Sequence, residues 1–133
     1  GIEAEGMIAS VFTASLRVYS SPIFDKLESE SGITFQKRLY RSDCTPNSFG
    51  GYGKDLSLVQ EDLSRCVLVD NNPLSFTPQP DNAIPVESWY SDPSDKTLAA
   101  VLELLRELAD EPDVRPVLRA RFQLAAYFAG KEM

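Results

Sequence analysis

Histidine is the first thing this sequence lacks: none occurs among its 133 residues. The chain therefore cannot supply a Ser–His–Asp or Cys–His nucleophilic mechanism, a histidine ligand for a metal, or a histidine general acid or base. Any chemistry on this chain must use carboxylates, lysine, arginine, hydroxyls, amides and backbone dipoles.

Thiols and long apolar runs are also scarce. The two cysteines, Cys44 and Cys66, form no Cys-x-x-Cys motif and are too few for a zinc site, so we expect both to be reduced in a cytosolic or nuclear environment. No apolar run approaches the roughly 20 residues of a membrane span. The first residues lack a basic segment followed by an apolar one, so residues 1–6 are expected to be a junction or a disordered start rather than a targeting signal.

The charge is biased toward acid, with 20 acidic and 13 basic residues and a net charge of −7. Nonspecific nucleic-acid binding and binding to anionic membranes are therefore disfavoured, since both surfaces would repel the chain. The content of 43% hydrophobic and 25% charged residues is that of a globular protein. Length and composition together predict a single domain over residues 1–133.

Apolar periodicity predicts strands and helices in alternation. A first helix follows a short strand, shows a kink or restart at Pro22 and ends at Gly32. The segment Arg41–Gly53 is predicted to be a loop because it is rich in proline, asparagine and glycine. The expected strands are Met7–Phe12, Ile33–Tyr40, Cys66–Val69 (buried on both faces) and Ala83–Val86. The other expected helices are Leu58–Leu63, one capped by Asp92 with Pro93 and broken at Pro112, and Val114–Phe128.

This order of elements predicts a parallel α/β sheet, in which ligands bind at the carboxyl ends of strands. Two strand ends are polar after an apolar run, at Thr13-Ala14-Ser15 and at Asp70-Asn71-Asn72-Pro73. Hydroxyls suit a phosphate, and an acid–amide pair suits a hard cation such as Mg²⁺. The simpler alternatives, a helix cap and a turn, remain open. Lys54 and Arg41 are either phosphate ligands or surface charges.

Taken in order, these segments resemble the haloacid dehalogenase superfamily. Within it they are similar to the phosphatases of the RNA polymerase II C-terminal domain and the nuclear LIM interactor-interacting-factor-like phosphatases. The resemblance covers residues from about Val11 to Val117. It rests on Thr13-Ala14-Ser15, Leu39-Tyr40-Arg41 with Cys44, Lys54-Asp55-Leu56-Ser57, Val69-Asp70-Asn71 with Pro73, Pro80–Val86, and Trp89 ahead of Ser94-Asp95.

The resemblance implies a role for each matching residue. Thr13 matches the hydroxyl that binds the transferring phosphoryl group, with Ala14 beside it. Lys54 matches the lysine that stabilises the phosphate and the aspartyl intermediate, and Arg41 matches an arginine that contacts the substrate phosphate. Asn71 matches a direct Mg²⁺ ligand, and Asp70 matches an acid of the catalytic site. Thr13, Lys54 and Asp70 are thus the expected catalytic residues, and the expected cofactor is Mg²⁺.

The chain departs from the family pattern at its most important motif. The family's nucleophile lies in an Asp-x-Asp motif, and no Asp-x-Asp occurs here; Glu3-Ala-Glu5 is a poor imitation. We therefore expect a Rossmann-like core that lacks its central first strand, weakened Mg²⁺ binding and no activity of the chain alone. Exposed strand edges would then favour a strand-exchanged or edge-paired homo-oligomer. The loop Cys44–Gly53 also lacks the histidine that relatives often carry.

Two functions follow from these expectations. The first is a Mg²⁺-dependent protein serine/threonine phosphatase that acts on a phosphoprotein through an aspartyl phosphate. The second is a non-catalytic binding or scaffold module of the same fold, similar to the mitochondrial presequence receptor. Retention of Lys54 beside Asp70-Asn71 favours the first. The expected location is nuclear or cytoplasmic, with mitochondria as the minor alternative.

Overall fold

The structure is a computed structural model that describes residues 6–86 and 95–132. It divides into two compact units, residues 1–46 and residues 47–133, and each is described by itself. Three expectations fall outside the described residues: the start at residues 1–5, the Asp92–Pro93 helix cap, and the Trp89–Ser94 part of the family resemblance. The single domain predicted over the whole chain stays a prediction.

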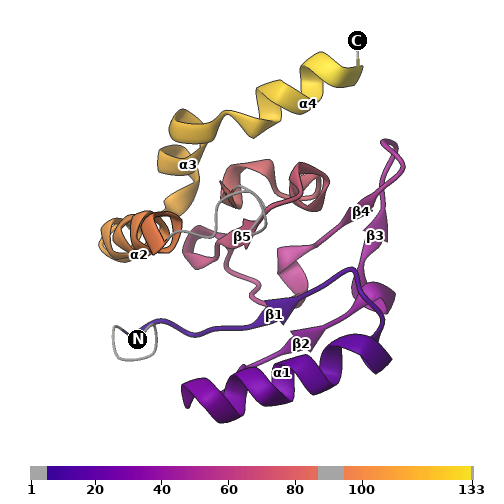
Figure 1. Cartoon of the computed structure of the whole chain (residues 1–133). Coiled ribbons are helices and arrows are strands. Elements are labelled where there is room, and N and C mark those ends of the chain that lie inside the picture. The colour runs from indigo at the N-terminus through magenta and orange to yellow at the C-terminus, as the bar shows by residue number, and fades with distance from the viewer. Residues whose placement is uncertain (1–5, 87–94, 133) are drawn as a thin grey trace. The chain divides into compact units, whose positions relative to one another are not determined.

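The first unit is a strand–helix–strand motif (Figure 1). Strand β1 (Val11–Phe12) leads into helix α1 (Arg17–Ser31), and β2 (Arg38–Leu39) returns parallel to β1. The register pairs Val11 with Arg38 and Phe12 with Leu39. A short 3₁₀ turn, η2 (Arg41–Asp43), and strand β3 (Thr45–Pro46) end the unit.

Helix α1 ends where the sequence predicts. Gly32 has a φ of 75°, and its N–H donates to the Glu28 carbonyl at 3.0 Å, which closes the helix with a left-handed residue. The helix continues through Pro22, so the chain does not restart there. The ring of Phe24 on this helix packs against Tyr40, whose side chain is 4% exposed.

The ladder strands of the first unit are shorter than the predicted Met7–Phe12 and Ile33–Tyr40. Backbone bonds nevertheless extend the parallel contact, from Gln36 N–H to the Ala9 carbonyl (2.8 Å) and from Thr13 N–H to the Leu39 carbonyl (2.9 Å). The predicted alternation therefore locates the right segments and overestimates the length of regular pairing.

The second unit is built on another parallel pair, β5 (Leu68–Asp70) and β6 (Ala83–Pro85), preceded by β4 (Tyr52–Gly53). Leu68, Val69 and Asp70 pair with Ala83, Ile84 and Pro85. The prediction that Cys66–Val69 is buried on both faces is wrong, because the Val69 side chain is 41% exposed. The α/β class with parallel pairing is confirmed, and the loss of a central strand stays a prediction.

Short 3₁₀ turns replace the predicted helix Leu58–Leu63. Asp55 and Asp62 accept bonds from the N–H groups of Ser57 (3.0 Å) and Ser64 (3.1 Å), so each Asp-Leu-Ser sequence closes a turn of its own. Side-chain capping at two nearby aspartates thus prevents one continuous helix. The turns of this unit are η3 (Leu56–Leu58), η4 (Leu63–Arg65), η5 (Pro73–Phe76) and η6 (Pro80–Asn82).

Three helices follow: α2 (Asp95–Ala109), α3 (Val114–Phe122) and α4 (Leu124–Glu132). The predicted single helix Val114–Phe128 is wrong, because Gln123 adopts a left-handed φ of 53° and separates α3 from α4. Leu118, 1% exposed, packs with Ile84 and the α2 residue Leu108 in one core cluster. A second cluster joins Phe76 and Ala83 to Phe128.

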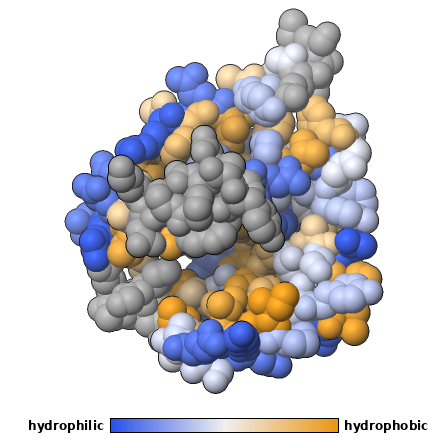
Figure 2. All heavy atoms as spheres, viewed as in Figure 1, coloured by the Kyte–Doolittle hydropathy of each residue, from blue (hydrophilic) through white to orange (hydrophobic). Residues whose placement is uncertain are grey.

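Apolar side chains also stand at the surface among hydrophilic ones (Figure 2). The most exposed on α1 are Val18 at 70% and Tyr19 at 68%. Within the described part of the chain, no helix is both long and apolar enough to cross a membrane.

Candidate active site

The site begins with an ion pair between Lys54, directly after β4, and Asp70, the last residue of β5. The Lys54 ammonium contacts Asp70 Oδ2, and each side chain is only 9% exposed. Removal of two charges from water is costly unless they compensate one another, and here they do so directly. The position of Asp70 agrees with the expectation that chemistry gathers at the carboxyl end of a parallel strand.

Backbone contacts hold both partners of this pair. The Lys54 N–H donates to the Ser75 carbonyl at 2.9 Å. Asp70 Oδ1 accepts the Asn72 N–H at 2.9 Å, and the Asp70 carbonyl accepts the Val86 N–H at 3.0 Å. Because Asp70 uses both side-chain oxygens, its carboxylate orientation is determined.

Gly53, the last residue of β4 and the residue before Lys54, allows β4 to lie close to Thr77 and Pro78. A Cβ at Gly53 would lie 2.9 Å from ring atoms of Pro78 and 2.9 Å from Thr77 Oγ1. Real Cβ atoms do not approach other atoms so closely, and the proline ring cannot turn aside. Glycine is therefore required here by packing.

A Gly53→Ala variant is expected to lower the free energy of unfolding by about 1–3 kcal/mol, because the methyl group overpacks against Pro78. Urea unfolding followed by circular dichroism measures this change. Gly130→Ala is the matched control, since nothing lies within 4 Å of a Cβ at that helical position. It should stabilise the chain slightly, since alanine is the better helix former. Equal effects at both glycines would contradict the close approach.

Asn71 follows Asp70 in an exposed position, and Asn72 accepts the Leu74 N–H at 3.0 Å to form the next turn. Among the described residues there is no group of three His, Cys, Asp or Glu side chains that could hold a metal. Mg²⁺ requires near-octahedral oxygen coordination. Asp70 is committed to Lys54 and Asn72, and Asn71 offers one amide oxygen, so these residues do not by themselves fit a magnesium site.

The other predicted phosphate ligands gather in the first unit, at the carboxyl end of β1. Thr13 Oγ1 accepts the Ser15 N–H at 3.0 Å. The Arg41 Nε donates to the Ala14 carbonyl at 2.6 Å, and the Arg41 N–H donates to the Ser15 carbonyl at 3.0 Å. The Cys44 thiol donates to the Thr13 carbonyl at 3.7 Å. A hydroxyl, a guanidinium and a thiol thus surround one backbone turn.

The structure therefore groups the predicted site residues by unit. Thr13, Ala14 and Arg41 meet in the first unit, and Lys54 and Asp70 meet in the second, with Asn71 next in sequence. Their roles in binding phosphate or metal stay predictions.

Sequence reasoning missed Gln79. Its Nε2 donates to Asp55 Oδ1 at 2.7 Å, and its Oε1 accepts the Leu56 N–H at 2.9 Å. The Gln79 amide, with the Ser57 hydroxyl and N–H, lowers the pKa of Asp55 below its ordinary value. The stabilisation contributed by Asp55 is therefore present above its ordinary pKa and is lost as the pH falls through the lowered value. No local pattern announces a contact over 24 residues.

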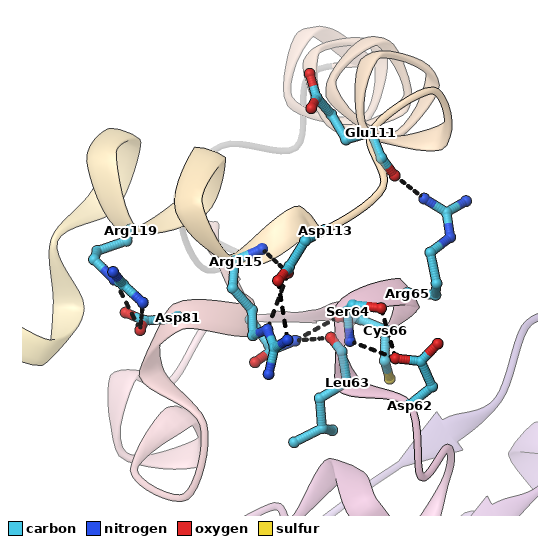
Figure 3. A network of polar contacts seen from close by, with 11 residues as sticks. Asp62, Leu63, Ser64, Arg65, Cys66, Asp81, Glu111, Asp113, Arg115 and Arg119 are labelled. Atoms are coloured by element: carbon cyan, nitrogen blue, oxygen red, sulfur yellow. Dashed lines mark hydrogen bonds and ion pairs between the residues drawn. The ribbon is translucent and has the colours of Figure 1, made fainter.

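Polar contacts also join α2 to Arg65, which precedes β5, and α3 to η6 (Figure 3). Arg65 donates to backbone carbonyls at the end of α2, at 3.1 Å to Ala109 and also to Glu111. Arg119 on α3 pairs with Asp81 of η6 at 2.9 Å. Positive charge at a helix C-terminus complements the partial negative charge of the last carbonyls.

Comparison with known proteins agrees with the resemblance in the sequence. A sequence model of the NLI interacting factor-like phosphatase family matches residues 5–115. CTD nuclear envelope phosphatase 1B of Danio rerio is 49% identical over 108 residues, which cover 81% of this chain and 43% of the relative. Nuclear envelope morphology protein 1 of Saccharomyces cerevisiae is 41% identical over 118 residues, 81% of this chain and 26% of the relative.

The chain thus spans less than half the length of these curated relatives. The match nevertheless covers most of this chain, including both strand ends and Lys54. The predicted family is confirmed, and the chain belongs to the NLI interacting factor-like phosphatases.

Proposed function

We propose that the complete protein is a magnesium-dependent protein serine/threonine phosphatase that works through an aspartyl-phosphate intermediate. This chain would supply its phosphate-positioning part and would be inactive alone. The observation that carries the proposal is the buried Lys54–Asp70 pair at the carboxyl end of β5. The family supports phosphatase activity, and the details are our inference.

The chemical argument concerns the charge of a phosphoryl group. Phosphoryl transfer needs preorganised positive charge and little else from the protein, because the transferring oxygens carry the negative charge. A lysine that is 9% exposed and held by a carboxylate already has its ammonium desolvated and oriented. In the first unit, by the family resemblance, Arg41 and Thr13 would also bind phosphate, and the structure anchors the Arg41 Nε to the Ala14 carbonyl.

In this proposal the attacking carboxylate would come from a segment outside the 133 residues, because they contain no Asp-x-Asp. Within the described residues, β5 pairs with β6 alone. A strand bearing the two aspartates and paired with the other edge of β5 would place its carboxylates beside Asp70. Those carboxylates would complete the magnesium ligands, with the Asn71 amide oxygen as a further ligand.

The test is hydrolysis of p-nitrophenyl phosphate with and without magnesium. We expect no magnesium-dependent hydrolysis by the 133-residue chain, and activity from a longer chain that carries an upstream Asp-x-Asp strand. In the longer chain, Lys54→Ala should lower kcat by about 10²–10³-fold, the loss typical of a removed electrostatic donor. Lys26→Ala, at an exposed lysine, is the control and should change nothing.

Two results would contradict the proposal. Rapid hydrolysis by the 133-residue chain would mean that another carboxylate attacks phosphorus. An inactive longer chain would favour the non-catalytic binding module instead.

We also infer that the protein works at or near the nuclear envelope on a phosphoprotein. Nuclear envelope names belong to the Danio rerio relative, which is 49% identical to this chain, and to the Saccharomyces cerevisiae relative, which is 41% identical. The cytoplasmic and mitochondrial alternatives gain no support from these comparisons.

A further inference from the structure

Two side chains at η6, those of Gln79 and Asn82, contact segments that adjoin the Lys54–Asp70 pair in sequence. Gln79 contacts Asp55 and Leu56, directly after Lys54. Asn82, 2% exposed, donates from Nδ2 to the Leu63 carbonyl at 2.7 Å and to the Cys66 carbonyl at 2.8 Å, directly before β5. Gln79 and Asn82, at the two ends of one short segment, therefore bind the chain after Lys54 and the chain before β5.

The Gln79 amide is bound through both its nitrogen and its oxygen. The nitrogen donates to the Asp55 carboxylate and the oxygen accepts the N–H of the next residue, Leu56, so the amide plane is held at both ends. Neither oxygen nor nitrogen can be replaced by an apolar group without loss of one bond. Its function in the molecule is therefore tied to the Asp55–Leu56 peptide.

The chain contains an internal comparison for this contact. Asp55-Leu56-Ser57 and Asp62-Leu63-Ser64 have the same sequence and the same capping bonds from serine N–H and Oγ to aspartate Oδ1. Each turn is also contacted by a distant amide, the first by Gln79 through the Asp55 carboxylate and the Leu56 N–H, and the second by Asn82 through the Leu63 carbonyl. Only Gln79 binds the capping aspartate itself, and it does so at the turn that adjoins Lys54.

We propose that Gln79 is a positioning residue of the phosphate site, which holds the backbone after Lys54 so that the Lys54 ammonium stays against Asp70. The inference rests on the proposed function for its consequence in catalysis, and on geometry alone for the positioning itself. In this proposal Gln79 contacts neither phosphate nor metal, and it acts only through the backbone next to Lys54.

The physical argument is that Lys54 has a long side chain whose direction depends on its backbone. The Lys54 N–H is anchored to the Ser75 carbonyl, and the Leu56 N–H is anchored to Gln79 two residues later. Together the two anchors determine the position of the Lys54 backbone. Loss of the second anchor would let the backbone shift, and a misplacement on the order of 1 Å can cost 10²-fold in rate.

The experiment uses the 133-residue chain and nuclear magnetic resonance of the lysine ammonium groups. An ammonium in a buried ion pair exchanges its protons slowly and gives a resolved ¹H–¹⁵N signal, whereas solvated lysines do not. Lys54 should give such a signal, assigned by its loss in Lys54→Met. The signal should disappear or lose most of its intensity in Gln79→Ala and in Asp55→Ala.

Two matched controls accompany these variants. Asp62→Ala removes the cap of the equivalent Asp-Leu-Ser turn, and Gln60→Ala removes a glutamine that accepts only a local bond from the Asp62 N–H at 3.2 Å. Both should keep the Lys54 signal. A full-strength signal in folded Gln79→Ala would overturn the proposal, and so would equal loss in Asp62→Ala. If Gln79→Ala does not fold, Asp55→Ala decides by the same criterion.

A pH profile separates positioning from packing. Gln79→Glu has nearly the same shape, but it faces Asp55 with a second carboxylate, and like charges raise the pH at which one of them binds a proton. The Lys54 signal should therefore be weak at pH 7 and should recover toward pH 5 more than it does in Gln79→Ala, because a shared proton restores the donor only in Gln79→Glu. Gln79→Ala corrects for the general slowing of ammonium proton exchange at lower pH, and an equal pH dependence in the two variants would count against the hydrogen-bonded anchor.

A second measurement separates this proposal from the proposed function. In a longer chain with the upstream aspartates, Gln79→Ala should lower kcat/KM about tenfold for p-nitrophenyl phosphate, and Gln60→Ala should not. Loss of the ammonium signal without loss of activity would support Gln79 as the residue that positions Lys54. The same result would contradict the proposed role of Lys54 in catalysis.

Discussion

Replacement of Lys54 by methionine is expected to lower the free energy of unfolding by about 3–5 kcal/mol, the cost of leaving a buried charge without its partner. Methionine fills a similar volume, so the loss reports the charge and not a cavity. The Asp70 side chain, 9% exposed, would keep the Asn72 N–H as its remaining contact. Urea unfolding of the 133-residue chain measures the change.

Two comparisons make the result specific to the buried pair. Lys26→Met removes an exposed pair with Glu30, whose side chains are 74% and 65% exposed, and should cost about 0.5 kcal/mol or less. Addition of Asp70→Asn to Lys54→Met should restore most of the lost stability, because the uncompensated charge is removed while an oxygen remains for Asn72. If Lys54→Met were no worse than Lys26→Met, Lys54 and Asp70 would not be paired in the folded protein.

Leu118→Ala is the second large expected effect, a loss of about 2–5 kcal/mol in the free energy of unfolding. Leu118 is 1% exposed on α3 and packs with Ile84 of β6 and with Leu104 and Leu108 of α2. Its truncation removes buried methyl groups and leaves a cavity that these neighbours cannot fill. The consequence reaches the site, because α3 also holds Asp81 of η6 through Arg119, and η6 adjoins Gln79.

Leu98→Ala is the control on α2, where the leucine side chain is 53% exposed. It should change the free energy of unfolding by about 0.5 kcal/mol or less, as surface substitutions usually do. Urea midpoints of both variants test the pair. Similar midpoints would show that α3 does not pack against β6 as the structure has it.

Much of the local structure could be predicted from the sequence. Gly32 ends α1 as predicted, because glycine adopts the left-handed backbone conformation at a positive φ without the steric cost of a Cβ. The segments near Val11, Arg38, Leu68 and Ala83 form the parallel pairs that the apolar runs indicate. The failures are also informative: two aspartate caps replaced the helix Leu58–Leu63, and Gln123 divided the last helix.

The sequence predicts a set of candidate site residues and not their arrangement. Polar residues at strand ends and the family motifs select Thr13, Arg41, Lys54 and Asp70-Asn71, and the roles of these residues stay predictions. That Lys54 lies against Asp70, 16 residues away, requires the packing of β4 and η5 around β5. Side-chain identity sets what a residue can bind, whereas its partner depends on which segments pack together.

The sequence by itself determined which chemical groups these 133 residues can supply. Composition shows the lack of histidine, residue order shows the lack of Asp-x-Asp, and the order of the motifs indicates the family. Only the tertiary structure decided that Gln79 is bound to Asp55 and that Lys54 is buried with Asp70. The physical reason is range: caps and turns act over a few residues and can be recognised in sequence, whereas these contacts join segments brought together by a shared core.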